Sequence, residues 1–238
     1  MKQETIARLQ ANDIKESKLE FIPVDNALNI SLYGVISEEG PNSSTVFMDL
    51  LADHADKTEI NLSINSIGGE IKEGFAIYEM LRHSPATVNI KVDGIAASMA
   101  SMICMAGDRV TMGPSSLMMI HNPICCVTGN AKELREQAER LDVQATAARQ
   151  AYLLKSGDRL SEDRLIELMD AETFLNANEC MEIGFCDEIS GFDPVQMTAQ
   201  IASLKADKEK LESEIERLKS ELRQNDEDKP SDETGWFF

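Results

Sequence analysis

Long apolar runs are absent from this sequence of 238 residues. The most apolar segment, residues 95–106, is far shorter than the roughly 20 residues that a helix needs to cross a bilayer. The opening residues, Met-Lys-Gln-Glu, lack the basic and then apolar pattern of a secretory signal. We therefore expect a soluble protein of the cytoplasm, with no membrane partner.

Basic residues are also scarce. The chain has 23 Lys and Arg against 42 Asp and Glu, which gives a formal net charge of −19. A phosphate backbone or an anionic membrane would be repelled by such a surface, because binding to either depends on clustered positive charge. This balance argues against nucleic acid as a partner.

Cysteine and histidine are few, and their spacing excludes several kinds of site. Five cysteines form an odd set without the paired spacing of a zinc site or a redox motif, so we expect reduced thiols and no metal or cofactor. Three histidines are present, at positions 54, 83 and 121. A reaction that needs a histidine base therefore has three candidates.

The order of apolar patterns predicts an α/β fold with a largely parallel sheet. Strands are expected at residues 59–65 and 87–93, near 110 and at 117–120, and helices at 45–54, at 70–83, from 97, and at 130–154, 161–170 and 176–183. We divide the chain into an N-terminal extension (1–25), a main globular domain (26–195), a coiled-coil helix (198–224) and an acidic, disordered tail (225–238). The length suits one sizeable domain with an added segment.

The coiled-coil prediction depends on a seven-residue repeat. The first series of heptad positions, which one lysine interrupts, is Ile201, Lys208, Ile215 and Leu222. The second series is Leu204, Leu211 and Leu218. Just over three heptads are marginal alone. We expect this segment to self-associate once several chains are held together.

Three segments carry the chemistry. Ser98 lies among small residues just after a β-type run, Gly68 and Gly69 follow another strand, and His121 follows the apolar residues 117–120. A serine hydroxyl becomes a nucleophile when a neutral histidine removes its proton and a carboxylate orients that histidine. Taken singly, each residue also fits a structural role, as a packing serine, a core histidine or a turn glycine; together they predict a serine hydrolase.

These segments, Asn65-Ser-Ile-Gly68-Gly69, Gly94-Ile-Ala-Ala-Ser98-Met99 and Met119-Ile-His121-Asn-Pro123, resemble the proteolytic subunit of the Clp protease. The resemblance spans about residues 28–189 and is strongest to the Clp-like head maturation proteases of bacteriophages. It implies a crotonase-like spiral of parallel-sheet ββα units, and it makes the helix at 130–154 a protruding handle through which rings stack.

The resemblance also assigns roles. Ser98 is implied as the nucleophile, His121 as the general base, and the backbone N–H groups of Gly69 and Met99 as oxyanion donors. The orienting acid lies in the segment Met169-Asp170-Ala-Glu172. We favour Asp170, with Glu172 as the alternative.

We therefore predict a serine endopeptidase that acts through an acyl-enzyme in a closed homo-oligomeric ring, possibly as a stacked double ring. The phage-type resemblance implies processing of capsid or scaffold precursors during head maturation, in the host cytoplasm or the precursor head. The alternatives are a degradative peptidase that works with an ATP-driven unfoldase, a crotonase-like acyl-CoA enzyme, and an assembly platform without activity.

Overall fold

The computed structural model describes residues 17–190 and four positions further along the chain, 210, 215, 217 and 219. The strands are β1 (Lys18–Val24), β2 (Ala27–Ile36), β3 (Glu59–Gly69), β4 (Thr87–Ala97), β5 (Arg109–Met112), β6 (Leu117–Ile120), β7 (Thr173–Asn176) and β8 (Glu188–Ile189). The helices are α2 (Ser44–Asp53), α3 (Ile71–Arg82), α4 (Met99–Cys104), α5 (Ala131–Ser156), α6 (Glu162–Asp170) and α7 (Ala177–Ile183), with a short 3-10 helix, η2 (Gly157–Arg159).

The sheet is mainly parallel. Its order is β1-β2-β3-β4-β5-β8, and β6 pairs with both β4 and β7. The pairs β2–β3, β3–β4, β4–β5, β4–β6 and β5–β8 are parallel, whereas β1–β2 and β6–β7 are antiparallel. The expected α/β class with a largely parallel sheet is confirmed, while the spiral of ββα units stays a prediction.

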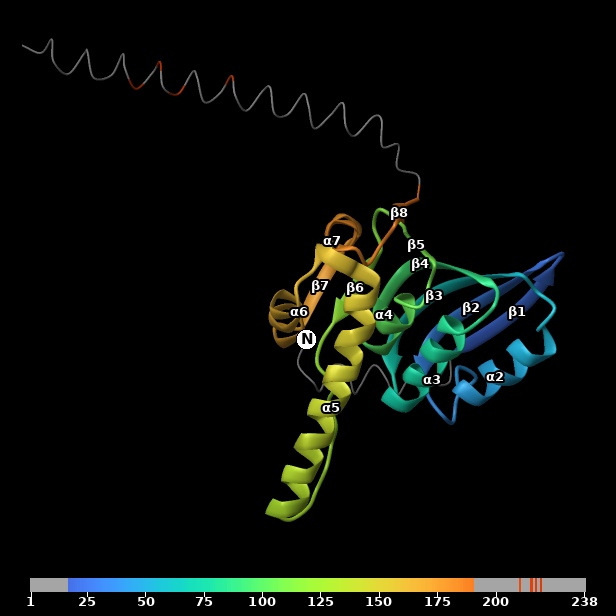
Figure 1. Ribbon diagram of the computed structural model, residues 1–238, viewed down its shortest axis with the longest axis horizontal. Helices are drawn as coiled ribbons and strands as arrows, with labels where there is room; N and C mark the ends of the chain where they lie inside the picture. The colour runs from blue at the N-terminus through green and yellow to red at the C-terminus, as the bar shows by residue number, and fades with distance from the viewer. Residues whose placement is uncertain (1–16, 191–209, 211–214, 216, 218, 220–238) are drawn as a thin grey trace, which may run out of the picture. The chain divides into compact units, whose positions relative to one another are not determined.

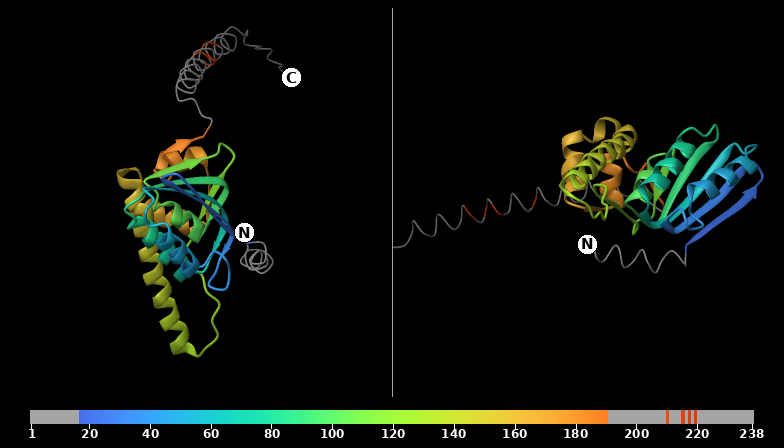
Figure 2. Two further views of the ribbon diagram at one scale, coloured as in Figure 1. Left: turned by 90° about the vertical axis from the view of Figure 1, so that its right-hand side faces the viewer. Right: turned by 90° about the horizontal axis from the view of Figure 1, so that it is seen from below.

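One face of the sheet is covered by helices and forms the core. Buried and half-buried residues alternate along the whole of β3, as expected for a strand with one face in the core. Figures 1 and 2 show α2, α3 and α4 on the same side of the strands. The largest fully buried side chains include Phe47, Phe185, Leu28, Ile30, Leu62, Ile64, Ile77, Leu81, Ile90 and Met102.

The folded domain begins earlier than the sequence analysis expected. Residues 1–25 were assigned to an extension, but β1 occupies part of that range and pairs with β2 as a hairpin. Phe21 of β1 packs edge-on against Phe47 of α2, with ring centroids 6.1 Å apart. The alternation of Leu19 and Phe21 with charged or exposed neighbours was the local signal for this strand.

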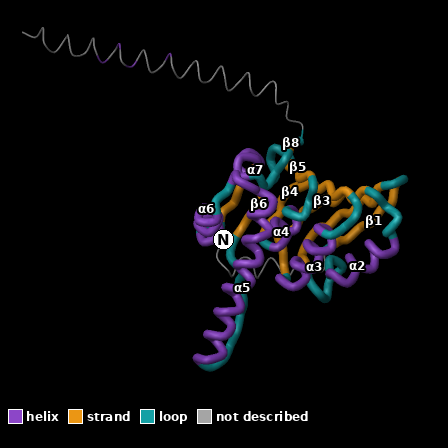
Figure 3. Tube along the Cα trace, in the orientation of Figure 1, coloured by secondary structure: helices purple, strands orange, loops and turns teal. Residues whose placement is uncertain are grey.

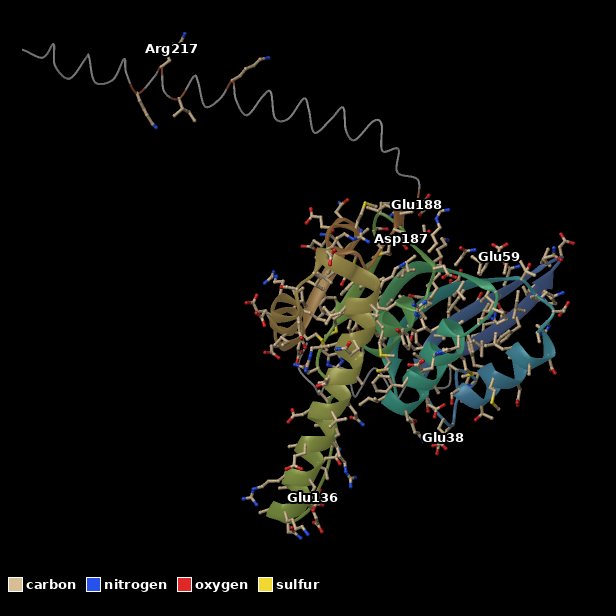
Figure 4. The ribbon with its side chains drawn as sticks, viewed as in Figure 1. Glu38, Glu59, Glu136, Asp187, Glu188 and Arg217 are labelled. Atoms are coloured by element: carbon tan, nitrogen blue, oxygen red, sulfur yellow. The ribbon has the colours of Figure 1, made fainter. Side chains whose placement is uncertain are left out.

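Helix α5 is the longest described helix, with 26 residues. Asn130 and Glu133 form a capping box at its start, and this arrangement explains why the helix begins there. Its buried residues all lie in its second half: Ala145, Ala148, Ala151, Tyr152 and Ser156. The first half projects from the body, as Figure 1 shows, and Glu136 marks this projecting part in Figure 4.

The segment between β6 and α5 forms neither helix nor strand. It leads from the end of β6 to the projecting end of α5, and Figure 3 shows it as loop. Its residues 124–130 are exposed. This segment and the projecting helix together extend away from the covered sheet.

The predicted coiled coil and acidic tail lie outside the described residues, apart from Lys210, Ile215, Arg217 and Lys219, which are helical. Within the part of the chain that the structure describes, no helix is both long and apolar enough to cross a membrane.

Candidate active site

Ser98 lies on the sharp turn between β4 and α4. Its backbone has φ 54° and ψ −126°, in the positive-φ region that a residue with a Cβ seldom adopts. Its N–H donates to the carbonyl of Met119 on β6 at 2.8 Å, so the turn is attached to the neighbouring strand. The small residues around Ser98 in the sequence allow this close arrangement of strand, turn and helix.

Gly68 packs directly against this turn. A Cβ at Gly68 would lie 2.6 Å from the Ala97 carbonyl oxygen and 2.8 Å from the Cβ of Ser98. Gly68 also has φ +89°, so both space and conformation require glycine. The register between β3 and β4 shifts just before it, between Ile64 and Ser66, which is consistent with a bulge beside a functional site.

Gly69 and Met99 are the predicted oxyanion donors. Gly69 has φ +156°, and a Cβ there would lie 1.9 Å from the carbonyl oxygen of Ile36. Met99 is the first residue of α4, where a helical N–H has no acceptor within its own helix. Both residues thus border the nucleophile turn, Gly69 next to Gly68 and Met99 next to Ser98.

His121 meets Ser98 because β6 runs parallel to β4. Ala97 pairs with Met119, so the residues that follow these two strands leave the sheet at the same edge. The Nε2 atom of His121 lies 2.8 Å from the Ser98 Oγ atom. The sequence prediction that these two residues lie within hydrogen-bond reach agrees with this distance.

The half-buried position of His121 favours the neutral ring that a general base needs. Burial lowers the pKa of His121 below its usual 6.5, while the negative charge of Glu172 and a hydrogen bond with the Asn122 backbone oppose this shift. When Nε2 accepts the Ser98 proton, the other ring nitrogen carries the ring's own proton. Glu172 and the Asn122 backbone are thus the groups that favour charge on this ring.

The two candidate acids occupy different places. Asp170 is exposed at the end of α6, and its Oδ1 accepts a hydrogen bond of 2.6 Å from the Asn122 side chain. Glu172 is half-buried in the connection to β7 and has φ 50°. The antiparallel β6–β7 register ends with Ile120 opposite Thr173, so His121 follows and Glu172 precedes the last pair of this ladder.

Sequence reasoning had not singled out two polar residues beside the site, Asn122 and Tyr152. Asn122 was visible next to His121, but its partner Asp170 is distant in sequence. Tyr152 lies on α5 and touches the site through Ser101. His54 and His83, the other two histidines, each bond a backbone carbonyl of the preceding turn through Nδ1. Among the described residues, no group of three or more His, Cys, Asp or Glu side chains is arranged to hold a metal ion.

Comparison with known proteins shows which family the sequence matches. The family model described as Clp protease matches residues 9–192. The ATP-dependent Clp protease proteolytic subunit of Pleurastrum terricola is 30% identical over 163 residues, covering 68% of this chain and 82% of the relative. Proteolytic subunit 1 of Gloeobacter violaceus is 30% identical over 67% of this chain and 81% of its own length. The proteolytic subunit of Deinococcus radiodurans is 30% identical over 65% and 76%.

Proposed function

Because this chain belongs to the Clp protease family, and is a serine-type peptidase, we propose that Ser98, His121 and Glu172 are its catalytic triad. The observation that carries the proposal is the contact of 2.8 Å between His121 Nε2 and Ser98 Oγ. A crotonase-like acyl-CoA enzyme has no need of this contact. An assembly platform without activity would not need it either.

The mechanism follows from the geometry. His121 Nε2 takes the proton of Ser98 as Oγ bonds to the peptide carbonyl carbon, and the carbonyl oxygen becomes an oxyanion. The N–H groups of Gly69 and Met99 stabilise this charge. His121 then gives its proton to the leaving amine as the C–N bond breaks. Water, deprotonated by the same ring, releases the acyl group and restores Ser98.

Glu172 is proposed as the orienting acid, in place of the Asp170 that the sequence favoured. Its position next to the last β6–β7 pair, Ile120 and Thr173, and its effect on the His121 pKa support this role. Asp170 instead accepts a hydrogen bond from the Asn122 side chain, and the backbone of Asn122 bonds the His121 ring. We assign Asp170 to positioning the residue after His121.

The test of the triad is labelling by a fluorophosphonate probe, which reacts with activated serines. Wild-type protein should be labelled, Ser98→Ala should not, and Ser156→Ala should be labelled like wild type. Ser156 is the matched control because it is buried and its hydroxyl bonds within α5, to the Leu153 carbonyl. Labelling that persists in Ser98→Ala would refute the assignment, as would unlabelled wild-type protein.

We further propose that the chain assembles into a homo-oligomeric ring and degrades proteins delivered by an ATP-driven unfoldase. Three relatives are named as ATP-dependent Clp proteolytic subunits, which supports this. The projecting half of α5 is proposed as the handle between rings; its Val143 and Leu134 are apolar and exposed, 70% and 44% respectively. Native mass spectrometry of wild type and Val143→Asp tests it: loss of the larger assembly is expected, and an unchanged mass would refute the handle role.

Processing of a phage capsid or scaffold precursor is the second proposal, supported by the heptad repeat of residues 201–222, which could locate the enzyme in a precursor assembly. Incubation with a capsid or scaffold precursor encoded beside this chain separates the two. Cleavage at a few defined sites without ATP favours processing. ATP-dependent degradation to short peptides, with the precursor left intact, favours the unfoldase partnership.

A further inference from the structure

A buried hydroxyl lies directly behind the nucleophile. Ser101, on α4, is fully buried, and its Oγ lies 2.7 Å from the Ser98 carbonyl oxygen and 3.1 Å from that of Met119. The Met119 carbonyl also accepts the N–H of Ser98. One side chain therefore contacts both the residue that bears the nucleophile and the strand that leads to His121.

The third partner of Ser101 comes from α5. The Tyr152 hydroxyl lies 2.8 Å from Ser101 Oγ, and the Tyr152 side chain is itself buried. Burial raises the pKa of Tyr152, so its hydroxyl keeps its proton. A serine hydroxyl has one proton to donate. Because Ser101 donates that proton to a carbonyl, Tyr152 must be the donor to Ser101.

Further contacts fix this end of α5 in place. The Tyr152 ring packs against Phe185, with centroids 5.2 Å apart. One turn further along, Lys155 Nζ donates to the Gly107 carbonyl at 3.0 Å and pairs with Asp187 at 2.6 Å. Figure 4 shows Asp187 far from Glu136, which marks the projecting half of the helix. Helix α5 is thus anchored close to the nucleophile and free of the body at its other end.

We propose that Tyr152 and Ser101 form a positioning pair through which α5 holds the nucleophile turn. Tyr152 fixes the orientation of the Ser101 hydroxyl, and Ser101 holds the Ser98 carbonyl and the end of β6. The role in catalysis rests on the proposed function of Ser98 and His121.

The pair does more than fill the core, because Ser98 holds an unfavourable backbone conformation. A residue with a Cβ at φ 54° and ψ −126° is strained and persists when the surroundings hold it. The Ser98 N–H donates to the Met119 carbonyl, and the Ser98 carbonyl accepts from the Ser101 hydroxyl and from the N–H groups of Ser101 and Met102. These bonds hold the Ser98 backbone to β6 and α4. Loss of one of them should move the Oγ atom rather than merely loosen packing.

The decisive variant is Tyr152→Phe, which removes the hydroxyl and keeps the ring. We expect kcat for a short peptide and the rate of fluorophosphonate labelling to fall about tenfold, the size of one lost hydrogen bond, with KM within twofold. Tyr78→Phe is the matched control, because Tyr78 is also a buried tyrosine but lies on α3. Both rates are measured well below the melting temperature and in samples of equal native mass.

A double-variant cycle separates positioning from general loss of stability. Because Tyr152 acts through Ser101, Ser101→Ala with Tyr152→Phe should lower kcat no further than Ser101→Ala alone. Multiplying effects would overturn the proposal. So would a Tyr152→Phe variant with unchanged kcat and a lower melting temperature, because that result describes a purely structural residue.

Amide hydrogen exchange gives a readout that does not depend on activity. Tyr152→Phe should speed exchange in peptides that cover residues 98–104 and leave exchange in peptides that cover β2 unchanged. Tyr78→Phe should not speed exchange at residues 98–104. If wild-type protein were unlabelled by the probe, the proposed function would fail while this readout still judged the pair. Unchanged exchange at residues 98–104 would refute the positioning role.

Discussion

The choice between Glu172 and Asp170 can be tested by replacing each carboxylate with its amide. Glu172→Gln and Asp170→Asn keep the size and shape of the side chains and remove one charge. The charge of Glu172 acts on the His121 ring, while Asp170 bonds Asn122 at the surface. The two substitutions should therefore affect catalysis through different groups.

The structure gives different magnitudes for the two changes. Loss of the carboxylate that orients a catalytic histidine lowers kcat by about 10³–10⁴-fold in serine proteases, or roughly 4–5.5 kcal/mol. We expect Glu172→Gln to lie at the lower end, near 10³-fold, because Glu172 is half-exposed to water. Asp170→Asn weakens one exposed hydrogen bond worth about 0.5–1.5 kcal/mol, so a loss of at most about tenfold is expected.

The pH profile provides a second, independent readout. Catalysis requires neutral His121, so kcat/KM falls as the pH drops through the lowered pKa of His121. Glu172 raises this pKa, so its neutralisation should move the acid limb to still lower pH. Asp170→Asn should leave the limb in place.

The assay is hydrolysis of a fluorogenic peptide from pH 4 to pH 8, with native mass measured for each variant. The reasoning would be refuted if Asp170→Asn caused the larger loss and shifted the acid limb while Glu172→Gln did neither. Asp170 would then be the orienting acid, as the sequence analysis favoured.

Three further predictions concern the packing and the thiols. Gly68→Ala should abolish probe labelling, because its Cβ would collide with Ala97 and Ser98, whereas Gly113→Ala, with no atom nearer than 3.8 Å, should be labelled like wild type. In the folded protein two thiols, those of Cys125 and Cys126, should react quickly with a disulfide reagent; the other three, whose pKa values burial raises, should react after unfolding: Cys104, Cys180 and Cys186. Phe47→Ala should lower the free energy of unfolding by about 3–5 kcal/mol in urea titrations, because Phe47 is fully buried.

The central strands and helices were predictable because each carries its own periodic signal. The strand at 59–65 and the helix at 70–83 correspond to β3 and α3 within a few residues. Local pattern was too weak at β1, where the short alternation of Leu19 and Phe21 lies in a polar segment and the strand forms by pairing with β2. Edge strands depend on such tertiary pairing, which periodicity does not contain.

The contact between Ser98 and His121 was predictable for a different reason. Ser98 and His121 each follow an apolar strand, and parallel strands carry their following residues to one edge of the sheet. The acid was harder, because two carboxylates lie within three residues of one another. Their contacts distinguish them: Glu172 acts on the His121 ring by its charge and Asp170 bonds Asn122, and both contacts exist in the folded chain alone.

The backbone itself marks the site. Within residues 17–190, three non-glycine residues have positive φ: Asp25 in the β1–β2 turn, Ser98 and Glu172. Two of the three are thus proposed members of one triad, and strained conformations of this kind persist when surrounding contacts over-determine them. For Ser98 those contacts are the Met119 carbonyl, the Ser101 hydroxyl and the N–H groups of Ser101 and Met102. The contacts that hold the proposed nucleophile in place therefore come from β6 and α4, and the Ser101 hydroxyl in turn contacts Tyr152 of the helix whose far end projects from the molecule.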